Sequence, residues 1–147
     1  MGDFIRYIVT GTHDLTLAEI ERGLKEVDSQ FSVFVNNAAP TSGDVLYGSE
    51  VYGEIEVNRA NDQMLREDVD ELREQLVELE DAGTVAVQQA LDSATGMIVF
   101  QLSVAGYDDY GKIDPFWDWM FDHYEGLLQV DEEGYYRRSE QILFIPW

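Results

Sequence analysis

The sequence contains no cysteine, two histidines and three prolines in 147 residues. Without cysteine the chain cannot form a disulfide framework, a thiolate zinc site, an iron–sulfur cluster or a cysteine nucleophile. A reducing compartment is the simplest environment for such a chain. Its first residues also lack the basic segment and apolar run of an export signal, so we expect a cytoplasmic protein.

Long apolar runs and basic residues are scarce. The longest apolar run, residues 97–106, contains Gln101 and Ser103 and is far shorter than the roughly 20 residues of a membrane-spanning helix. Nine Lys and Arg against 30 Asp and Glu give a net charge of −21. Such a field repels phosphates and anionic lipids and favours basic partners, so we expect neither nucleic acid nor a membrane. Adaptation to a salty cytoplasm would also explain the acidity.

The sequence does contain enough apolar side chains for a core, because 45% of the residues are hydrophobic and 12% are aromatic. The length is that of one domain. We therefore predict a single domain, residues 1–147, that folds without a metal or a disulfide.

Periodicity and turn signals predict an α+β protein. Strands are expected at 4–9, 31–35, 45–57, 97–104, 127–130 and 141–145, and helices at 16–28, 62–80, 84–92 and 115–124. Thr16 and Glu19 have the spacing of a capping box, and Asp114-Pro115 is typical of a helix start. The Asp81-Ala82-Gly83 segment is expected to end the second helix.

Three connections are also predicted. Residues 36–43, with Pro40, are expected to form a loop, and Gly48 and Gly53 to bend the third strand. The last two strands are expected to form a hairpin around residues 131–134.

The order of these elements matches a ferredoxin-like, split βαβ arrangement. We expect an antiparallel sheet with helices on one face, extended by a C-terminal α-β-β unit. The alternative is a tandem βαββ duplication, because a strand, a turn, a helix and two strands occur both in residues 4–57 and in residues 98–145.

Residues that carry chemistry are few. His13 and His123 are about 110 residues apart and lack any zinc-site spacing. No phosphate-binding glycine loop or nucleophile elbow is present. The two arginines of Tyr135-Tyr136-Arg137-Arg138 are expected to form ion pairs rather than bind bases. We therefore predict no catalytic residue, metal ligand or cofactor, and a chain that is more an interaction protein than an enzyme.

Two groups of residues are candidates for binding a partner. The first is an acidic ridge on the second helix, opposite a leucine stripe that either packs in the core or forms a dimer seam. Its residues are Glu67, Asp70, Glu71, Glu74 and Glu78. The second group is Tyr107, Tyr110 and Trp119, aromatic residues among acidic ones. Trp119 is expected either to anchor a partner or to pack under the C-terminal segment 145–147.

These observations favour a non-catalytic, acidic protein-binding module, similar in charge and size to inhibitor or immunity proteins, that engages a basic surface as a monomer or homodimer. The alternative is a small enzyme or ligand-binding protein with a carboxylate-based site and a salt-adapted surface. An apolar pocket with two or three converging polar groups would favour this alternative.

Overall fold

The computed structural model describes residues 4–11, 15–59 and 62–146, and in these it contains eight strands and five α-helices. The strands are β1 (Phe4–Val9), β2 (Phe31–Asn36), β3 (Ala39–Tyr47), β4 (Glu50–Arg59), β5 (Gly96–Leu102), β6 (Gly126–Val130), β7 (Gly134–Arg137) and β8 (Glu140–Phe144). The helices are α1 (Leu17–Val27), α2 (Gln63–Glu74), α3 (Ala82–Asp92), α4 (Val104–Asp108) and α5 (Asp114–His123), with a 3-10 turn, η1 (Tyr110–Lys112). The predicted α+β class is confirmed.

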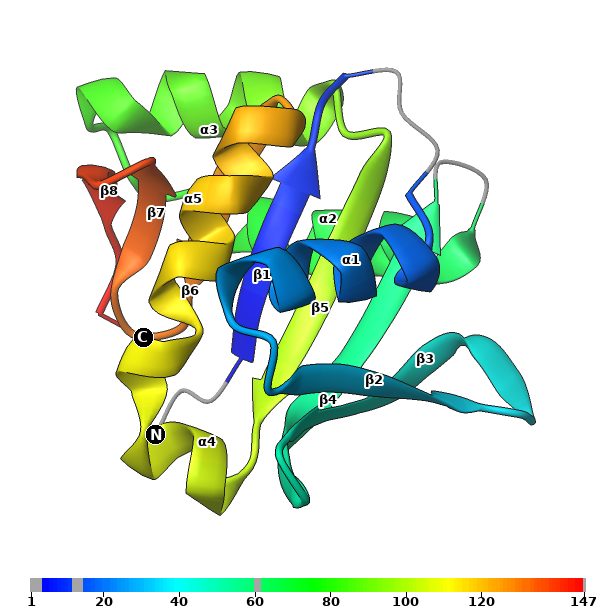
Figure 1. The fold of residues 1–147 in the computed structure, drawn as a ribbon. Coiled ribbons are helices and arrows are strands. Elements are labelled where there is room, and N and C mark those ends of the chain that lie inside the picture. Colours follow the sequence, from blue (N-terminus) through cyan, green and yellow to red (C-terminus); the bar gives the residue numbers. More distant parts are fainter. Residues whose placement is uncertain (1–3, 12–14, 60–61, 147) are drawn as a thin grey trace.

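All eight strands join one open antiparallel sheet in the order β2-β3-β4-β5-β1-β6-β7-β8 (Figure 1). The first strand of the chain lies near the middle. There Ile5 is the cross-strand partner of Phe100 in β5 and of Val130 in β6. The N-terminal strand is therefore completed only by strands from the last third of the chain.

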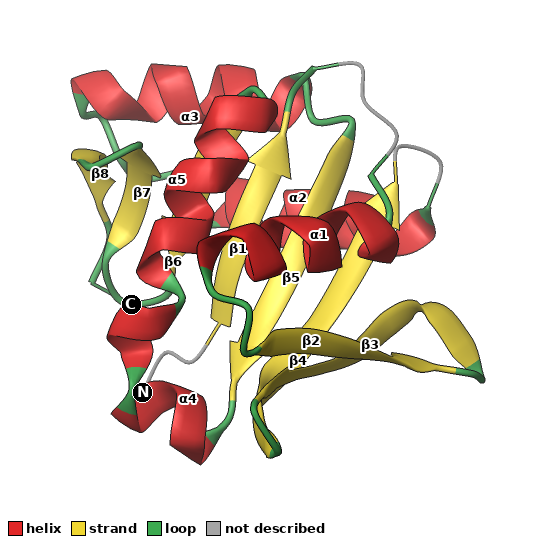
Figure 2. Cartoon of the chain, in the orientation of Figure 1, coloured by secondary structure: helices red, strands yellow, loops and turns green. Residues whose placement is uncertain are grey.

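Helices cover both faces of the sheet (Figures 1 and 2). On one face α1 and α5 pack over the strands, where Ile20 and Phe116 share a core with Phe100. On the opposite face α2 and α3 form a second core, in which Leu72 lies with Met97. The two cores are separated by the sheet, and each is lined by alternate residues of the central strands.

The prediction of helices on one face is wrong. In β5, Ile98 and Phe100 belong to the core under α1 and α5, whereas Met97 belongs to the core under α2 and α3. Four consecutive apolar residues, 97–100, give this strand two apolar faces, and such a strand needs cover on both sides. The alternation of Ile98 with Phe100 indicates only one apolar face, and the adjacent Met97 is the sign of the second.

The ferredoxin-like arrangement is not confirmed. α5 does connect β5 to β6, two strands that flank β1, as in a split βαβ unit. However, α2 and α3 connect β4 to β5, which are direct antiparallel neighbours. The tandem alternative does not fit the strand order either. After α1 the strands run from the sheet edge inward, whereas after α5 they run from the centre to the other edge.

Several local signals are confirmed. Thr16 is the N-cap of α1, and its Oγ1 accepts a hydrogen bond from the backbone N–H of Glu19 at 3.2 Å. The Glu19 carboxylate pairs with Arg22. The described contacts therefore do not include the second hydrogen bond of a capping box, in which the Glu19 side chain would accept from the backbone N–H of Thr16. Gly48 has a φ of 61° in the β3–β4 turn. Gly53 lies where the β3–β4 register shifts, as expected of a bulge.

The second helix is shorter than predicted. α2 ends at Glu74, residues 75–78 form turns, and Asp81 is the N-cap of α3. Gly83 does not end a helix. It lies in the first turn of α3, where a Cβ would overlap the backbone oxygen of Ile142. This glycine therefore allows α3 to approach β8 closely.

The leucine stripe packs in the core, which is one of the two predicted alternatives. Leu65, Val69, Leu72 and Leu76 are all buried in the core shared by α2, α3 and the sheet. Because this stripe already faces the sheet, it is not available as a dimer seam.

Two connections differ from the prediction. The chain turns at Asn37 and Ala38, and β3 begins directly afterwards, so the expected loop at 36–43 is mostly strand. At the C-terminus β7 lies between β6 and β8 and pairs with both. The predicted hairpin of the last two strands is therefore wrong. Tyr135 of β7 is fully buried and belongs to the core shared by α2, α3 and the sheet.

Candidate functional site: an acidic face of the sheet

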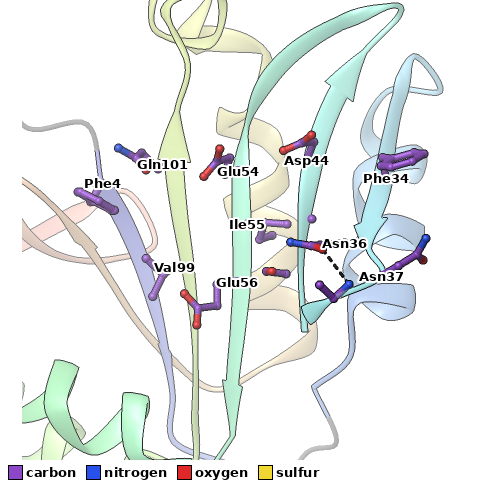
Figure 3. A pocket seen from close by; sticks show the side chains of 13 residues that line it. Phe4, Phe34, Asn36, Asn37, Asp44, Glu54, Ile55, Glu56, Val99 and Gln101 are labelled. Carbon is purple, nitrogen blue, oxygen red and sulfur yellow. Dashed lines mark hydrogen bonds between the residues drawn. The ribbon is translucent and has the colours of Figure 1, made fainter. Parts of the chain in front are cut away.

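A row of five in-register residues crosses the sheet between β2 and β1. The cross-strand partners are Phe34 and Asp44, Asp44 and Glu54, Glu54 and Gln101, and Gln101 and Phe4. Figure 3 shows these side chains side by side across the sheet, from Phe4 on β1 to Phe34 on β2. This row, which we call the acidic row, has an aromatic ring at each end and two carboxylates and an amide between them.

The alternation of β4 explains why these carboxylates share one face. Ile55 and Val57 point into the core under α1 and α5, so Glu54 and Glu56 point to the opposite face. α2 covers that face only at the end of β4. Along the strand, Asn58 is buried, Glu56 is half-buried and Glu54 is exposed.

The uncovered part of this face is hollowed. The depression, which we call the acidic hollow, has a volume of about 660 Å³ and is lined by residues of β1 to β5 and of the β2–β3 turn (Figure 3). Its lining includes the carboxylates of Asp44, Glu54 and Glu56, and no lysine or arginine of the described residues lines it. Phe34, with 66% of its side chain exposed, stands at one side.

Negative charges face one another in this hollow. Asp44 and Glu54 are directly opposed across two antiparallel strands, a placement that destabilises a sheet. Burial, together with the charges of Asp68 and Asp62, raises the pKa of Glu56 above its ordinary value. A cation placed here would relieve this repulsion.

Four residues of the acidic ridge predicted on the second helix lie on α2, and the fifth, Glu78, lies in the turns that follow this helix. Its residues, Glu67, Asp70, Glu71, Glu74 and Glu78, are all exposed. On the inner side of α2, a carboxylate oxygen of Asp68 accepts a hydrogen bond from Asn58 of β4 at 3.3 Å. Asp70 lies 3.5 Å from Arg73. Burial and the charges of Glu71 and Glu67 raise the pKa of Asp68, whereas Arg6 lowers it. Since Asp68 in turn acts on Glu56, negative charge continues from the hollow onto the first half of α2, and Arg73 neutralises part of it further along the helix.

The three predicted aromatic residues do not share one environment. Tyr107 of α4 is half-exposed, and Tyr110 of η1 is half-buried against the core. Trp119 has only 8% of its side chain exposed, and its indole N–H donates to the Glu26 carboxylate. Its ring packs against Gly23 of α1, where a Cβ would come within 2.6 Å. Trp119 thus closes the α1–α5 contact, which neither predicted alternative described.

Only one of the two histidines can be placed. His13 lies outside the described residues. The ring of His123 stacks on Trp119 at a centroid distance of 4.1 Å, and its Nδ1 lies 2.8 Å from the backbone oxygen of the same residue. Arg138 pairs with Asp122 at 2.6 Å, so the predicted ion pairing is confirmed for this arginine. In the described part of the chain, no three His, Cys, Asp or Glu side chains are grouped to hold a metal.

Sequence reasoning missed the acidic hollow. One signal was present, because Glu54 and Glu56 alternate with Ile55 and Val57 and so mark a polar strand face. Nothing in the sequence indicated that Phe4 lies beside Glu54 and Glu56. Phe4 comes close to these residues only because β1 pairs with β5.

The comparisons with known proteins give no relative. No protein-family model matches the chain, no curated protein is significantly similar to it in sequence, and no solved structure is significantly similar to its fold. Among the described helices, none has the length and apolarity to cross a membrane.

Proposed function

We propose that the protein is a non-catalytic, cytoplasmic binding module whose acidic hollow receives a basic segment of another protein. The observation that supports this is the in-register opposition of Asp44 and Glu54 between two aromatic side chains. A lysine or arginine seated between these carboxylates would relieve their repulsion. Phe34 would contact the aliphatic stem or the charged group of a neighbouring basic residue. The ring of Phe4 already has the guanidinium of Arg6 over it, 5.2 Å from its centroid.

The size and surroundings of the hollow favour a peptide segment. A volume of about 660 Å³ is enough for several side chains rather than one. The exposed carboxylates of α2 extend the negative surface beside the hollow. Such a field accelerates the encounter with a basic partner and disfavours phosphate backbones.

The test uses a short labelled peptide of alternating arginine and threonine, with binding followed by fluorescence anisotropy at low salt. The triple variant D44N/E54Q/E56Q removes the charge of the hollow without changing side-chain volume. We expect it to weaken binding by about tenfold or more. The control E67Q/E71Q/E74Q changes the net charge equally on the outer face of α2, and we expect it to weaken binding by less than about threefold.

Each other outcome contradicts the proposal in a different way. Equal losses in both triple variants would mean that only the overall field attracts the peptide. A larger loss of affinity in the α2 control would place the peptide-binding surface on the acidic ridge and not in the hollow. Absence of saturable binding by the wild-type protein would reject a basic partner segment altogether.

A further inference from the structure

A second hollow lies on the other face of the sheet, between α5 and strands β6 and β7. Its volume is about 310 Å³, which is at the lower end of the range for small-molecule sites. Four aromatic side chains line it, Tyr110, Trp117, Phe121 and Tyr136. We call this hollow the aromatic cleft.

Three carboxylates surround the aromatic cleft. Asp114 and Asp118 lie one turn apart on α5, and Glu133 lies in the turn between β6 and β7. Burial and the negative charges of Asp118 and Glu133 raise the pKa of Asp114. These side chains come from two separate elements, so their convergence is a property of the tertiary fold and not of one helix face.

The cation at this site is already paired. Arg138 is the only lysine or arginine among the described residues that line the cleft. It is held by Asp122 at 2.6 Å and lies over the ring of Phe121, 5.9 Å from its centroid. The ring of Phe121 thus accepts a cation at its face. Among the described residues no lysine or arginine pairs with the three carboxylates, although Glu133 accepts a hydrogen bond from the Tyr136 hydroxyl at 2.7 Å.

Trp117 supplies an independent observation. This residue lines the cleft and has 4% of its side chain exposed. Its indole N–H is buried and has no hydrogen-bond partner among the described residues. A buried indole N–H normally donates to an acceptor. Because the Nε1 atom is enclosed, an oxygen atom on a bound molecule reaches this donor only after a local opening of the cleft beside Trp117.

We propose that the aromatic cleft binds an organic cation, an alkylated ammonium group that carries a hydroxyl or carbonyl oxygen. Aromatic ring faces attract such cations, and quaternary ammonium groups bind among aromatic side chains. The carboxylates of Asp114, Asp118 and Glu133 complement the charge, and the N–H of Trp117 donates to the oxygen. The cleft lies on the face of the sheet opposite the acidic hollow, so this proposal does not rest on the proposed function.

The test compares choline with 3,3-dimethylbutan-1-ol, which has the same shape without the charge. Titration calorimetry measures both affinities, and the indole N–H resonance of Trp117 is followed by NMR. We expect choline to bind at least about tenfold more tightly than the neutral alcohol, with a shift of the Trp117 resonance. Equal affinities for choline and the neutral alcohol would show that the cleft binds both as an apolar cavity and does not recognise the charge, which would overturn the proposal. Absence of saturable choline binding would overturn it as well.

A matched pair of variants tests the residues. D114N/E133Q keeps the side-chain volumes and should weaken choline binding about tenfold. The control E50Q/E80Q changes two exposed carboxylates that do not line the cleft and should leave choline binding unchanged. Thermal unfolding of both variants checks that they are folded. If D114N/E133Q binds choline as tightly as the wild type does, the carboxylates play no part and the proposal fails.

A second arm distinguishes two sources of the same chemistry. A neutral peptide with one trimethyl-lysine carries the ammonium group on a protein, whereas choline carries it as a free molecule. Tighter binding of either probe identifies the source, and binding of neither rejects the site. Saturating choline should not change the affinity of the basic peptide for the acidic hollow, so the two proposals can fail separately.

Discussion

The carboxylate of Glu21 in α1 accepts a hydrogen bond from the backbone N–H of Val33 in β2 at 2.7 Å. β2 is an edge strand, and the outward N–H groups of an edge strand are those with which another chain can pair. α1 therefore closes part of this edge with a side chain. The neighbouring Phe34 and Val35 are exposed apolar residues, so an open edge here would be prone to self-association.

We predict that Glu21→Ala promotes self-association. The variant loses the acceptor that occupies the Val33 N–H, and the stability should fall by about 1 kcal/mol. Sedimentation velocity over a range of concentrations should show dimers or larger species. The control Glu19→Ala also removes one carboxylate from α1 and should stay at the wild-type state of association. Identical sedimentation of the two variants would contradict the edge-protection role.

Gly23→Ala should destabilise the protein although alanine favours a helix. The added Cβ would lie 2.6 Å from ring atoms of Trp119, so α1 and α5 must separate. We expect a loss of about 1–3 kcal/mol in urea unfolding, which outweighs a gain in helix propensity of about 1 kcal/mol. Gly111→Ala is the control, because nothing lies within 4 Å of its added Cβ. An unchanged unfolding midpoint for Gly23→Ala would show that the helix contact is loose.

The raised pKa of Glu56 has a defined effect on stability. Because the folded state binds this proton more readily than the unfolded chain, the ionised group lowers stability at neutral pH. This loss is relieved as the pH falls through the raised pKa toward the ordinary value of 4.5. Glu56→Gln should therefore be more stable than the wild type at pH 7, and the difference should shrink as the pH approaches 4.5. Urea unfolding at several pH values measures it, and a difference that grows on acidification would contradict the prediction.

The opposition of Asp44 and Glu54 predicts a salt-dependent coupling. Asp44→Asn should stabilise the protein by about 0.2–1 kcal/mol at low salt, because like charges directly opposite are unfavourable. The gain should disappear near 1 M salt, where the Debye length is about 3 Å. A double-mutant cycle with Glu54→Gln, measured by urea unfolding, isolates the pair. Additive effects of the two substitutions at low salt would show that the carboxylates do not interact.

Local signals in the sequence predicted most of the secondary structure. Thr16 at the start of α1 and Gly48 in the β3–β4 turn act through their own neighbours, so a short window contains their effect. The end of α2 was not predictable in this way. The leucine spacing continues to Leu79, but the chain must turn after Glu74 so that α3 can pack across the sheet. Tertiary packing decided that boundary.

The candidate site was less predictable from the sequence than the secondary structure. The acidic ridge is visible on one helix, whereas the acidic row needs four strand registers to bring Phe4 and Phe34 to its ends. Periodicity shows which residues of a strand share a face, but not whether a helix covers that face. The position of Trp119 illustrates the same limit, because it depends on the absence of a side chain at Gly23.

The central place of β1 governs how this chain can reach its native state. The neighbours of β1 are β5 and β6, and its contact with Val130 joins positions far apart in the chain. Contacts of such high sequence separation slow folding, because a long loop must close before they form. During translation the emerging N-terminal strand has no native neighbour until β5 leaves the ribosome, and its second neighbour follows later still. Native folding is therefore expected to follow the release of most of the chain.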